Sequence, residues 1–179
     1  MTQTSQPVTD PLTLAALDTE RHVARSGWDQ PVRLFALVPT SDLLTHQPQL
    51  ADGLAAHDAV AGALSAVEQE ELPEADGLED LLARIAWPDQ VSGCAIAVER
   101  IVVPPEAERD LPHDDADALR AVAEHPQRAD VRLVVAVTRD GEARCLLRQR
   151  EHDSDDRVAL GDDIAPGLVH ALRATFSPD

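Results

Sequence analysis

The chain has 179 residues, 44% of them hydrophobic and 27% charged, and its 33 acidic and 15 basic side chains give a net charge of −18 at pH 7. This is the length of one globular domain, large enough to bury a core without a metal ion or a disulfide. The composition excludes a disordered chain and a membrane protein. The negative charge argues against a nucleic-acid partner, because phosphate contacts require a basic surface.

The N-terminus and the cysteines indicate a cytoplasmic protein. Residues 1–9 are polar and aperiodic, which predicts a flexible tail ahead of a single domain at 10–179. We find no secretion signal and no apolar run of about eighteen residues that could span a membrane. Cys94 and Cys145 lie in apolar, strand-like runs, so we expect buried free thiols rather than a disulfide.

Residues 10–44 predict a helix, a strand and a brief second helix. Asp10 is a favourable N-cap residue, and Pro11 fits the first turn, where no amide donor is needed. Residues 26–27, Ser-Gly, end this helix. The apolar run at 32–38 is bounded by prolines and predicts a strand, after which Ser41 can cap a brief helix through residue 44.

Later segments predict further helices and one long strand. Residues 51–67 are rich in alanine but contain two glycines, so helix and loop both stay open there. The run at 91–103 predicts a strand ended by two prolines. Apolar residues recur at helical spacing in three segments: 77–85, 116–123 and, after a cap at Asp162 or Asp163, 164–176.

The segment 130–150 predicts a β-hairpin around Asp140 and Gly141. A two-residue loop would mix apolar and charged side chains on one face. A three-residue loop with Gly141 in the left-handed conformation instead pairs Thr138 with Glu142, which makes the odd-numbered face of both strands almost entirely apolar. We therefore predict the bulged hairpin.

These elements predict an α+β fold, with a four-stranded, mostly antiparallel or mixed sheet and helices packed on it. Trp28 and Trp87 each follow a predicted helix and precede a predicted strand. Each is therefore expected at a helix–strand corner, with its ring largely buried.

Three stretches carry a resemblance to a known family: SAVEQEELP, IAWPDQVSGCAIAVERIVVPP and VRLVVAVTRDGEARCLLRQREHDSDD. The chain resembles, over residues 10–176, an uncharacterised family of small acidic actinobacterial proteins. The absence of Lys, Asn and Tyr indicates a high-GC source, either an actinobacterium or an extreme halophile, and the resemblance favours the first. The family has no established activity, so the resemblance implies no catalytic residue and no cofactor.

No motif assigns a catalytic activity. The chain has no nucleophile elbow and no glycine-rich phosphate loop, and without lysine it has no Walker lysine. Cys94 has no neighbouring cation or helix start in the sequence to lower its pKa, which favours a packed strand residue over a nucleophile. His57, His113 and His152 each precede an aspartate, a pairing that suits a metal site but also arises by chance in so acidic a chain.

One face of the hairpin gathers basic side chains in an otherwise acidic protein: Arg132, Arg144, Arg148 and Arg150. We call these four the arginine face. They are either solvated and paired with nearby acids or in contact with a partner surface. We expect a non-enzymatic cytoplasmic protein-interaction module whose partner is another protein, with a homodimer possible. The alternative is a small enzyme or ligand-binding protein that uses Cys94 or a histidine–carboxylate metal site.

Overall fold

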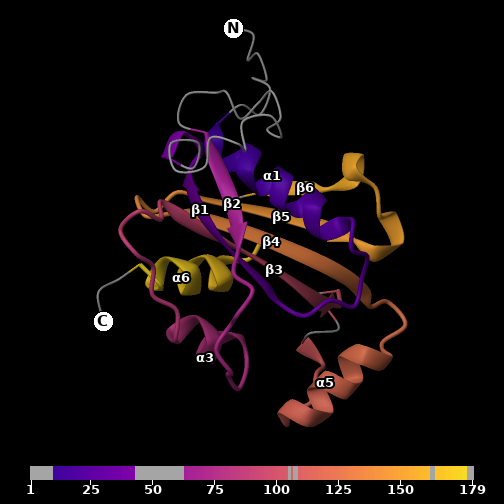
Figure 1. The fold of residues 1–179 in the computed structure, drawn as a ribbon. Helices are drawn as coiled ribbons and strands as arrows, with labels where there is room; N and C mark the ends of the chain where they lie inside the picture. The colour runs from indigo at the N-terminus through magenta and orange to yellow at the C-terminus, as the bar shows by residue number, and fades with distance from the viewer. Residues whose placement is uncertain (1–9, 43–62, 105, 107–108, 162–163, 177–179) are drawn as a thin grey trace, which may run out of the picture.

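The computed structural model describes residues 10–42, 63–104, 106, 109–161 and 164–176. One antiparallel sheet runs through this part of the chain, in the order β2-β1-β3-β4-β5-β6 (Figure 1). The strands are β1 (Arg33–Pro39), β2 (Leu64–Glu68), β3 (Gly93–Val102), β4 (Ala129–Thr138), β5 (Ala143–Gln149) and β6 (Ala159–Gly161). The tail expected at 1–9 lies outside the described residues.

Helices cover both faces of the sheet, which confirms the α+β class. Helix α1 (Pro11–Ala24) crosses one face, and α3 (Leu78–Ala83) and α6 (Pro166–Ala174) pack on the other. Helix α5 (Asp115–Glu124) lies beside the C-terminal end of β3 (Figure 1). Two 3₁₀ turns, η3 (Arg150–His152) and η4 (Asp155–Arg157), link β5 to β6. No described helix is long and apolar enough to cross a membrane.

The expectation of four strands is wrong, since the described part of the sheet has six. β2 occupies the end of the alanine-rich segment 51–67, whose earlier residues lie outside the described part. Alanine favours a helix locally, but pairing along β1 overrides that preference at 64–68. β6 pairs only three residues with β5, and a strand this short leaves no readable period in the sequence.

The predicted start and end of α1 are confirmed, whereas the caps predicted for two later helices are wrong. The Asp10 side chain accepts a hydrogen bond from the Thr13 amide at 2.8 Å, with Pro11 in the first turn of α1. Gly27 has a φ of +83°, so it supplies the left-handed residue after the helix. Residues 40–42 are helical, so the short helix is present, but it already includes residue 40 and Ser41 therefore does not cap it. The cap expected at Asp162 or Asp163 is wrong, because α6 begins at Pro166 with Ala165 as its N-cap residue. Proline fits this first turn, where no amide donor is needed, so the helix starts without a capping side chain.

The bulged register of the β4–β5 hairpin is confirmed. The Thr138 amide donates to the Glu142 carbonyl at 2.9 Å, and Gly141 has a φ of +98°. Opposite pairs include Leu133 with Leu147 and Arg132 with Arg148. Even-numbered residues of both strands therefore share one face, as the period of two requires.

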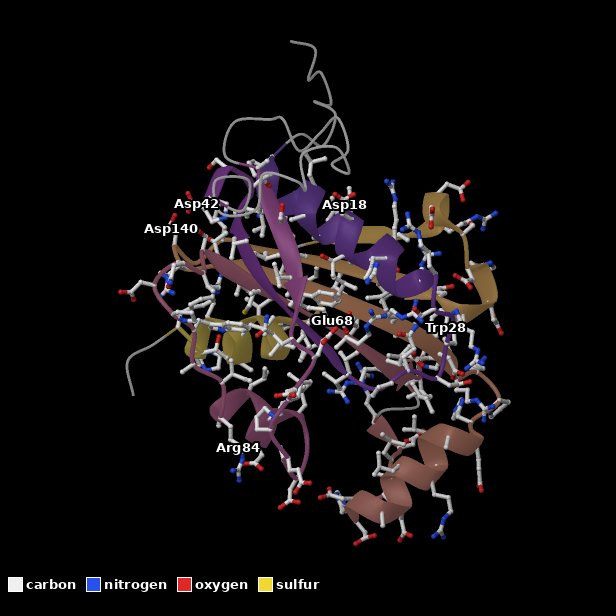
Figure 2. The ribbon with its side chains drawn as sticks, viewed as in Figure 1. Asp18, Trp28, Asp42, Glu68, Arg84 and Asp140 are labelled. Atoms are coloured by element: carbon white, nitrogen blue, oxygen red, sulfur yellow. The ribbon has the colours of Figure 1, made fainter. Side chains whose placement is uncertain are left out.

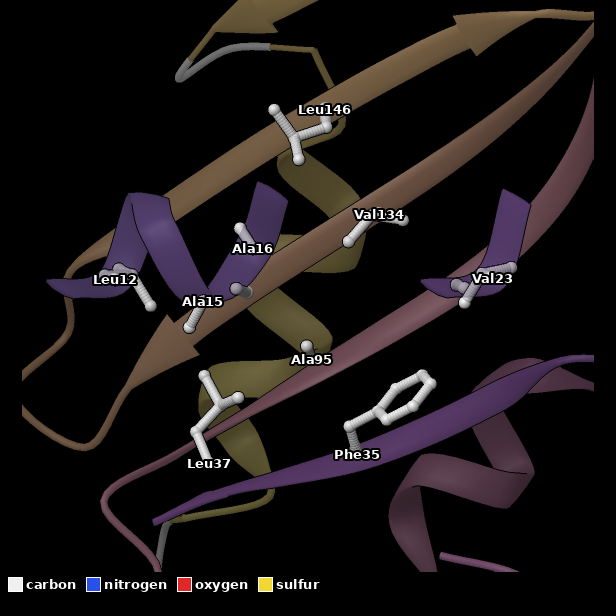
Figure 3. Packing of buried hydrophobic residues seen from close by; sticks show 11 residues of the cluster. Leu12, Ala15, Ala16, Val23, Phe35, Leu37, Ala95, Val134 and Leu146 are labelled. Atoms are coloured by element: carbon white, nitrogen blue, oxygen red, sulfur yellow. The ribbon is translucent and has the colours of Figure 1, made fainter. Parts of the chain in front are cut away.

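Two main apolar layers sandwich the sheet. Figure 3 shows the layer under α1, where Leu12, Ala15, Ala16 and Val23 pack on strand residues Phe35, Leu37, Ala95, Ala97, Val134, Ala136 and Leu146. The other layer joins the sheet to α3 and α6, and includes the predicted stripe Ile164, Leu168, Leu172 and Phe176. Both cysteines are buried in this second layer as free thiols, as predicted.

Both tryptophans lie at helix–strand corners, and each residue is largely but not fully buried, as predicted. Trp28 follows α1, and its indole N–H donates to Asp153 at 3.0 Å. Trp87 follows α3, donates to the Thr175 hydroxyl at 2.9 Å and stacks on Phe176. The indole N–H of Trp28 thus finds an exposed acceptor, whereas that of Trp87 finds the buried hydroxyl of Thr175.

Candidate functional site

The arginine face lies against α1, so two of its four residues are buried and not available to solvent or to a partner. Arg132 and Arg148 are 1% and 2% exposed, whereas Arg144 is partly buried and Arg150 remains accessible. Arg132, Arg144 and Arg148 do share a side of the hairpin, but that side is also the floor of the α1 layer, and Arg150 follows β5 in η3. The two-residue period of a β-strand predicts which side chains share a face of the sheet. Whether those side chains are exposed depends on the helix that packs on that face.

Arg148 is the centre of a buried ion-pair cluster. Its Nε and Nη2 donate to the two carboxylate oxygens of Glu20 in α1, at 2.7 and 2.6 Å. Glu20 is itself only 1% exposed. Arg148 also donates to Asp153 at 2.9 Å and to Asp155 at 2.6 Å, in the segment between β5 and β6. The hydrogen bonds that Arg148 donates to Glu20 above all raise the pKa of Arg148, so the guanidinium stays charged.

Arg132 lies directly opposite Arg148, under the indole ring of Trp28. Its guanidinium carbon is 4.3 Å from the ring centroid, a cation–π contact, and its Nη2 donates to the Gly27 carbonyl. Glu99 on β3 approaches the same nitrogen at 3.5 Å. The Nε and Nη1 atoms have no hydrogen-bond partner among the described residues. The aromatic face therefore provides much of the stabilisation of this buried charge.

Arg150 closes the cluster from the outside. It donates to both carboxylate oxygens of Asp29, at 2.9 and 3.1 Å, and lies 5.6 Å from the Trp28 ring. Asp29 has a φ of +65°, and its amide and that of Gln30 donate to the two oxygens of Glu99. Figure 2 shows Trp28 at the end of α1, on the side of the 150–157 segment. The turn at 27–30 is thus fastened to the sheet by Glu99 on β3 and by Arg150, which follows β5.

Arg144 anchors the other end of α1. It donates to the Thr13 hydroxyl at 2.9 Å and to Asp10 at 3.2 Å. Partial burial acts to raise the pKa of Asp10, but hydrogen bonds from Thr13 and Arg144 outweigh it, so the pKa lies below its ordinary value. The helix-capping carboxylate is therefore also half of an ion pair to the sheet.

Together these contacts make the arginine face a clamp that holds α1 and the 150–157 segment on the sheet. The sequence carried one signal of this role. Glu20 lies four residues after Ala16 and three before Val23, within the buried stripe of α1. A carboxylate in a core-facing stripe requires a cationic partner, and the inward arginines of the hairpin supply it.

The residues considered for catalysis differ in their environment where the structure describes them. Burial raises the pKa of Cys94 to about 12, which keeps the thiol protonated near neutral pH. His113 and His152 are exposed, and His57 lies outside the described residues. Within the described part, no group of three or more His, Cys, Asp or Glu residues could hold a metal ion.

A groove of about 380 Å³ between α3 and α6 has the volume of a small-molecule site but few polar groups. Leucine, isoleucine and alanine side chains form most of its walls. The Thr175 hydroxyl is already hydrogen-bonded to Trp87 and to the Leu172 carbonyl. Glu79 is the ionisable residue among those that line the groove. The groove therefore lacks the converging polar groups that orient a ligand.

The end of the sheet beside α5 carries exposed apolar side chains instead. Leu119 on α5 is 73% exposed, the highest value among the large hydrophobic residues described, and Ile101 and Val102 at the end of β3 are 44% and 40% exposed. No residue of α5 is buried. We call Ile101, Val102 and Leu119 the α5 surface. The sequence predicted this helix and, in general, helices packed on the sheet, whereas Leu119 on this helix is exposed.

Comparison with known proteins gives a family and no activity. The model of the PPA1309-like protein family matches residues 12–177, so the chain belongs to this uncharacterised family. No curated protein and no solved structure matches the chain significantly.

Proposed function

We propose that this member of the PPA1309-like family is a non-enzymatic cytoplasmic module that binds another protein through the α5 surface. The observation that carries the proposal is the exposure of Leu119 on a helix without a buried residue. The two buried free cysteines support a reducing compartment.

Helix α5 has little within the described chain to stabilise it. It has ten residues, and isolated helices shorter than about 12–15 residues are marginal in water. Its local support is the Asp114 cap, which accepts from the Asp117 amide at 3.1 Å, and the acidic first turn. Most helices gain their stability by burying an apolar stripe. A partner that covers Leu119 would supply that burial.

The end of β3 presents the other two apolar side chains on a two-stranded ribbon. β1 pairs with β3 only as far as Ala97, and β5 pairs with β4 only as far as Val131. Beyond these positions β3 and β4 pair with each other alone, and Ile101 and Val102 point to opposite faces. A ribbon that projects past its neighbours is accessible to a partner from both sides.

The remaining expectations give weaker proposals. An interaction through the arginine face would require α1 to leave the sheet, since Arg132 and Arg148 lie beneath it. The alternative of a small enzyme draws no support from Cys94, because its raised pKa disfavours the reactive thiolate. A homodimer that forms through the α5 surface is a special case of the interaction module.

Site-specific photo-crosslinking tests the proposal. A benzophenone amino acid replaces Ala116, an exposed residue one turn before Leu119, in the full chain expressed in its own cells. We expect a protein adduct of defined mass that disappears when Leu119→Asp is added. Leu160→Asp on β6 is the matched control, because Leu160 is also an exposed leucine, and it should leave the adduct unchanged. No adduct, or an adduct that Leu119→Asp does not affect, would overturn the proposal.

A further inference from the structure

We propose that the α5 surface binds a basic segment of a different protein, one that places an apolar side chain on Leu119 and arginines or lysines on either side of it. This inference rests on the proposed function and names its partner chemistry. It excludes a second copy of this chain as the occupant.

The charge around the α5 surface supports a cationic partner. Between residues 104 and 125 the chain has seven acidic and two basic side chains. The acidic residues described there are all exposed: Glu106, Asp110, Asp114, Asp115, Asp117 and Glu124. An apolar anchor within an acidic rim fits a segment with the opposite charge pattern.

The carboxylates of α5 are also available for a partner. Within the described residues, Asp115, Asp117 and Glu124 form no ion pair, whereas the carboxylates near α1 are held by arginines. A partner's guanidinium would therefore gain an unoccupied acceptor and would not have to displace an existing ion pair.

The same charges oppose a second copy. Two identical chains would each contribute a net charge of −18 and would place two acidic rims within one interface. At physiological salt the screening length is about 8 Å, so charges that face each other across an interface still repel. Apolar contact through one leucine per copy would have to overcome this repulsion, whereas a basic segment converts it into attraction.

Fluorescence anisotropy with designed peptides tests the inference on the full-length protein. The probe is a labelled peptide of about 18 residues, with leucines at helical spacing and arginines between them. This length allows the peptide to span α5 and its acidic rim. One control peptide has glutamate in place of arginine, and the other has the probe's residues in a scrambled order. We expect the probe to bind more tightly than both controls and to lose affinity as salt rises from about 0.1 to 0.5 M.

Variants of the protein separate specific docking from general attraction to an acidic chain. Leu119→Asp should weaken the probe about tenfold or more, as expected for loss of an interface anchor, while Leu160→Asp should leave it unchanged. Asp117→Asn and Glu124→Gln should each weaken it. Asp117→Asn removes a negative charge near the start of α5, where it stabilises the helix, and Glu124→Gln removes one at its end, where it destabilises the helix. If both variants bind the probe less tightly, the cause is therefore the lost charge and not a change in helix stability.

Each contrary result has a defined meaning. Equal binding of the scrambled peptide, or no effect of Leu119→Asp, Asp117→Asn and Glu124→Gln, would overturn the inference. In the crosslinking experiment, an adduct of two copies of this chain would also overturn it but would leave the protein-binding function standing. Absence of any adduct would remove the function itself.

Discussion

The ion pair between Arg148 and Glu20 allows a sharp test of the clamp on α1. Replacing Glu20 with leucine leaves the Arg148 guanidinium, 2% exposed, with Asp153 and Asp155 as its remaining carboxylates. Breaking a buried pair by removing one partner costs about 3–5 kcal/mol. Because those two aspartates are themselves 41% and 62% exposed, solvent screens them and they compensate only in part. We expect Glu20→Leu to lower the free energy of unfolding by about 3 kcal/mol.

The double replacement Glu20→Leu with Arg148→Met gives the decisive comparison. Buried pairs exchanged for apolar residues of similar volume are often neutral or stabilising, because the desolvation of both charges is avoided. The double variant should therefore be more stable than Glu20→Leu alone in urea unfolding monitored by tryptophan fluorescence. Arg84→Ala, which removes an exposed pair with Asp80, is the control and should change little. A loss below about 1 kcal/mol for Glu20→Leu would refute a buried clamp.

Two further predictions concern the corners and the acid stability. Trp28→Ala and Trp87→Ala should each cost about 2–3 kcal/mol in urea unfolding, at or below the lower end of the 3–5 kcal/mol of a fully packed ring, because both residues keep a partly exposed portion. A loss below about 1 kcal/mol would show that the rings do not seal the corners. The lowered pKa of Asp10 means that its contribution is present above the unfolded pKa near 3.8 and is lost as pH falls through the lower folded value. Unfolding curves from about pH 5 to pH 2 should thus show a shallower loss for Asp10→Asn than for the parent chain, and parallel losses would refute the assignment.

Local signals predicted the elements whose stability is decided locally. The Asp10 cap, the left-handed Gly27 and the bulge at Gly141 each depend on residues within a few positions, and each is confirmed. β2 and β6 depend instead on the edges of β1 and β5, which are distant in sequence. The sequences of these alanine-rich and polar segments do not indicate that β1 and β5 offer edges to pair with. The prediction of four strands was wrong because it counted only strands with a local sequence signal.

The arginine face shows the same limit at the level of side chains. The hairpin register placed Arg132 and Arg148 together, but neither the pairing nor the period states what lies above them. The two positions are buried because the inward carboxylate of Glu20 and the ring of Trp28 arrive from α1 and the turn after it. Exposure is a property of the assembled layers, and it can be predicted only when the partner of each face is known.

The part of the clamp around the turn at 27–30 lies at the same end of the sheet as the α5 surface, and this placement connects stability with the proposed binding. Glu99 fastens the turn at 29–30 to β3 only two residues before Ile101, and Arg150 is 3.7 Å from Asp130, the strand partner of Ile101. These contacts fix the ribbon that would otherwise extend alone beyond its neighbours. A fixed ribbon reduces the conformational entropy that binding must remove, so affinity depends less on buried area. Glu99 and Arg150 would then contribute to the α5 surface indirectly, by holding its base in place.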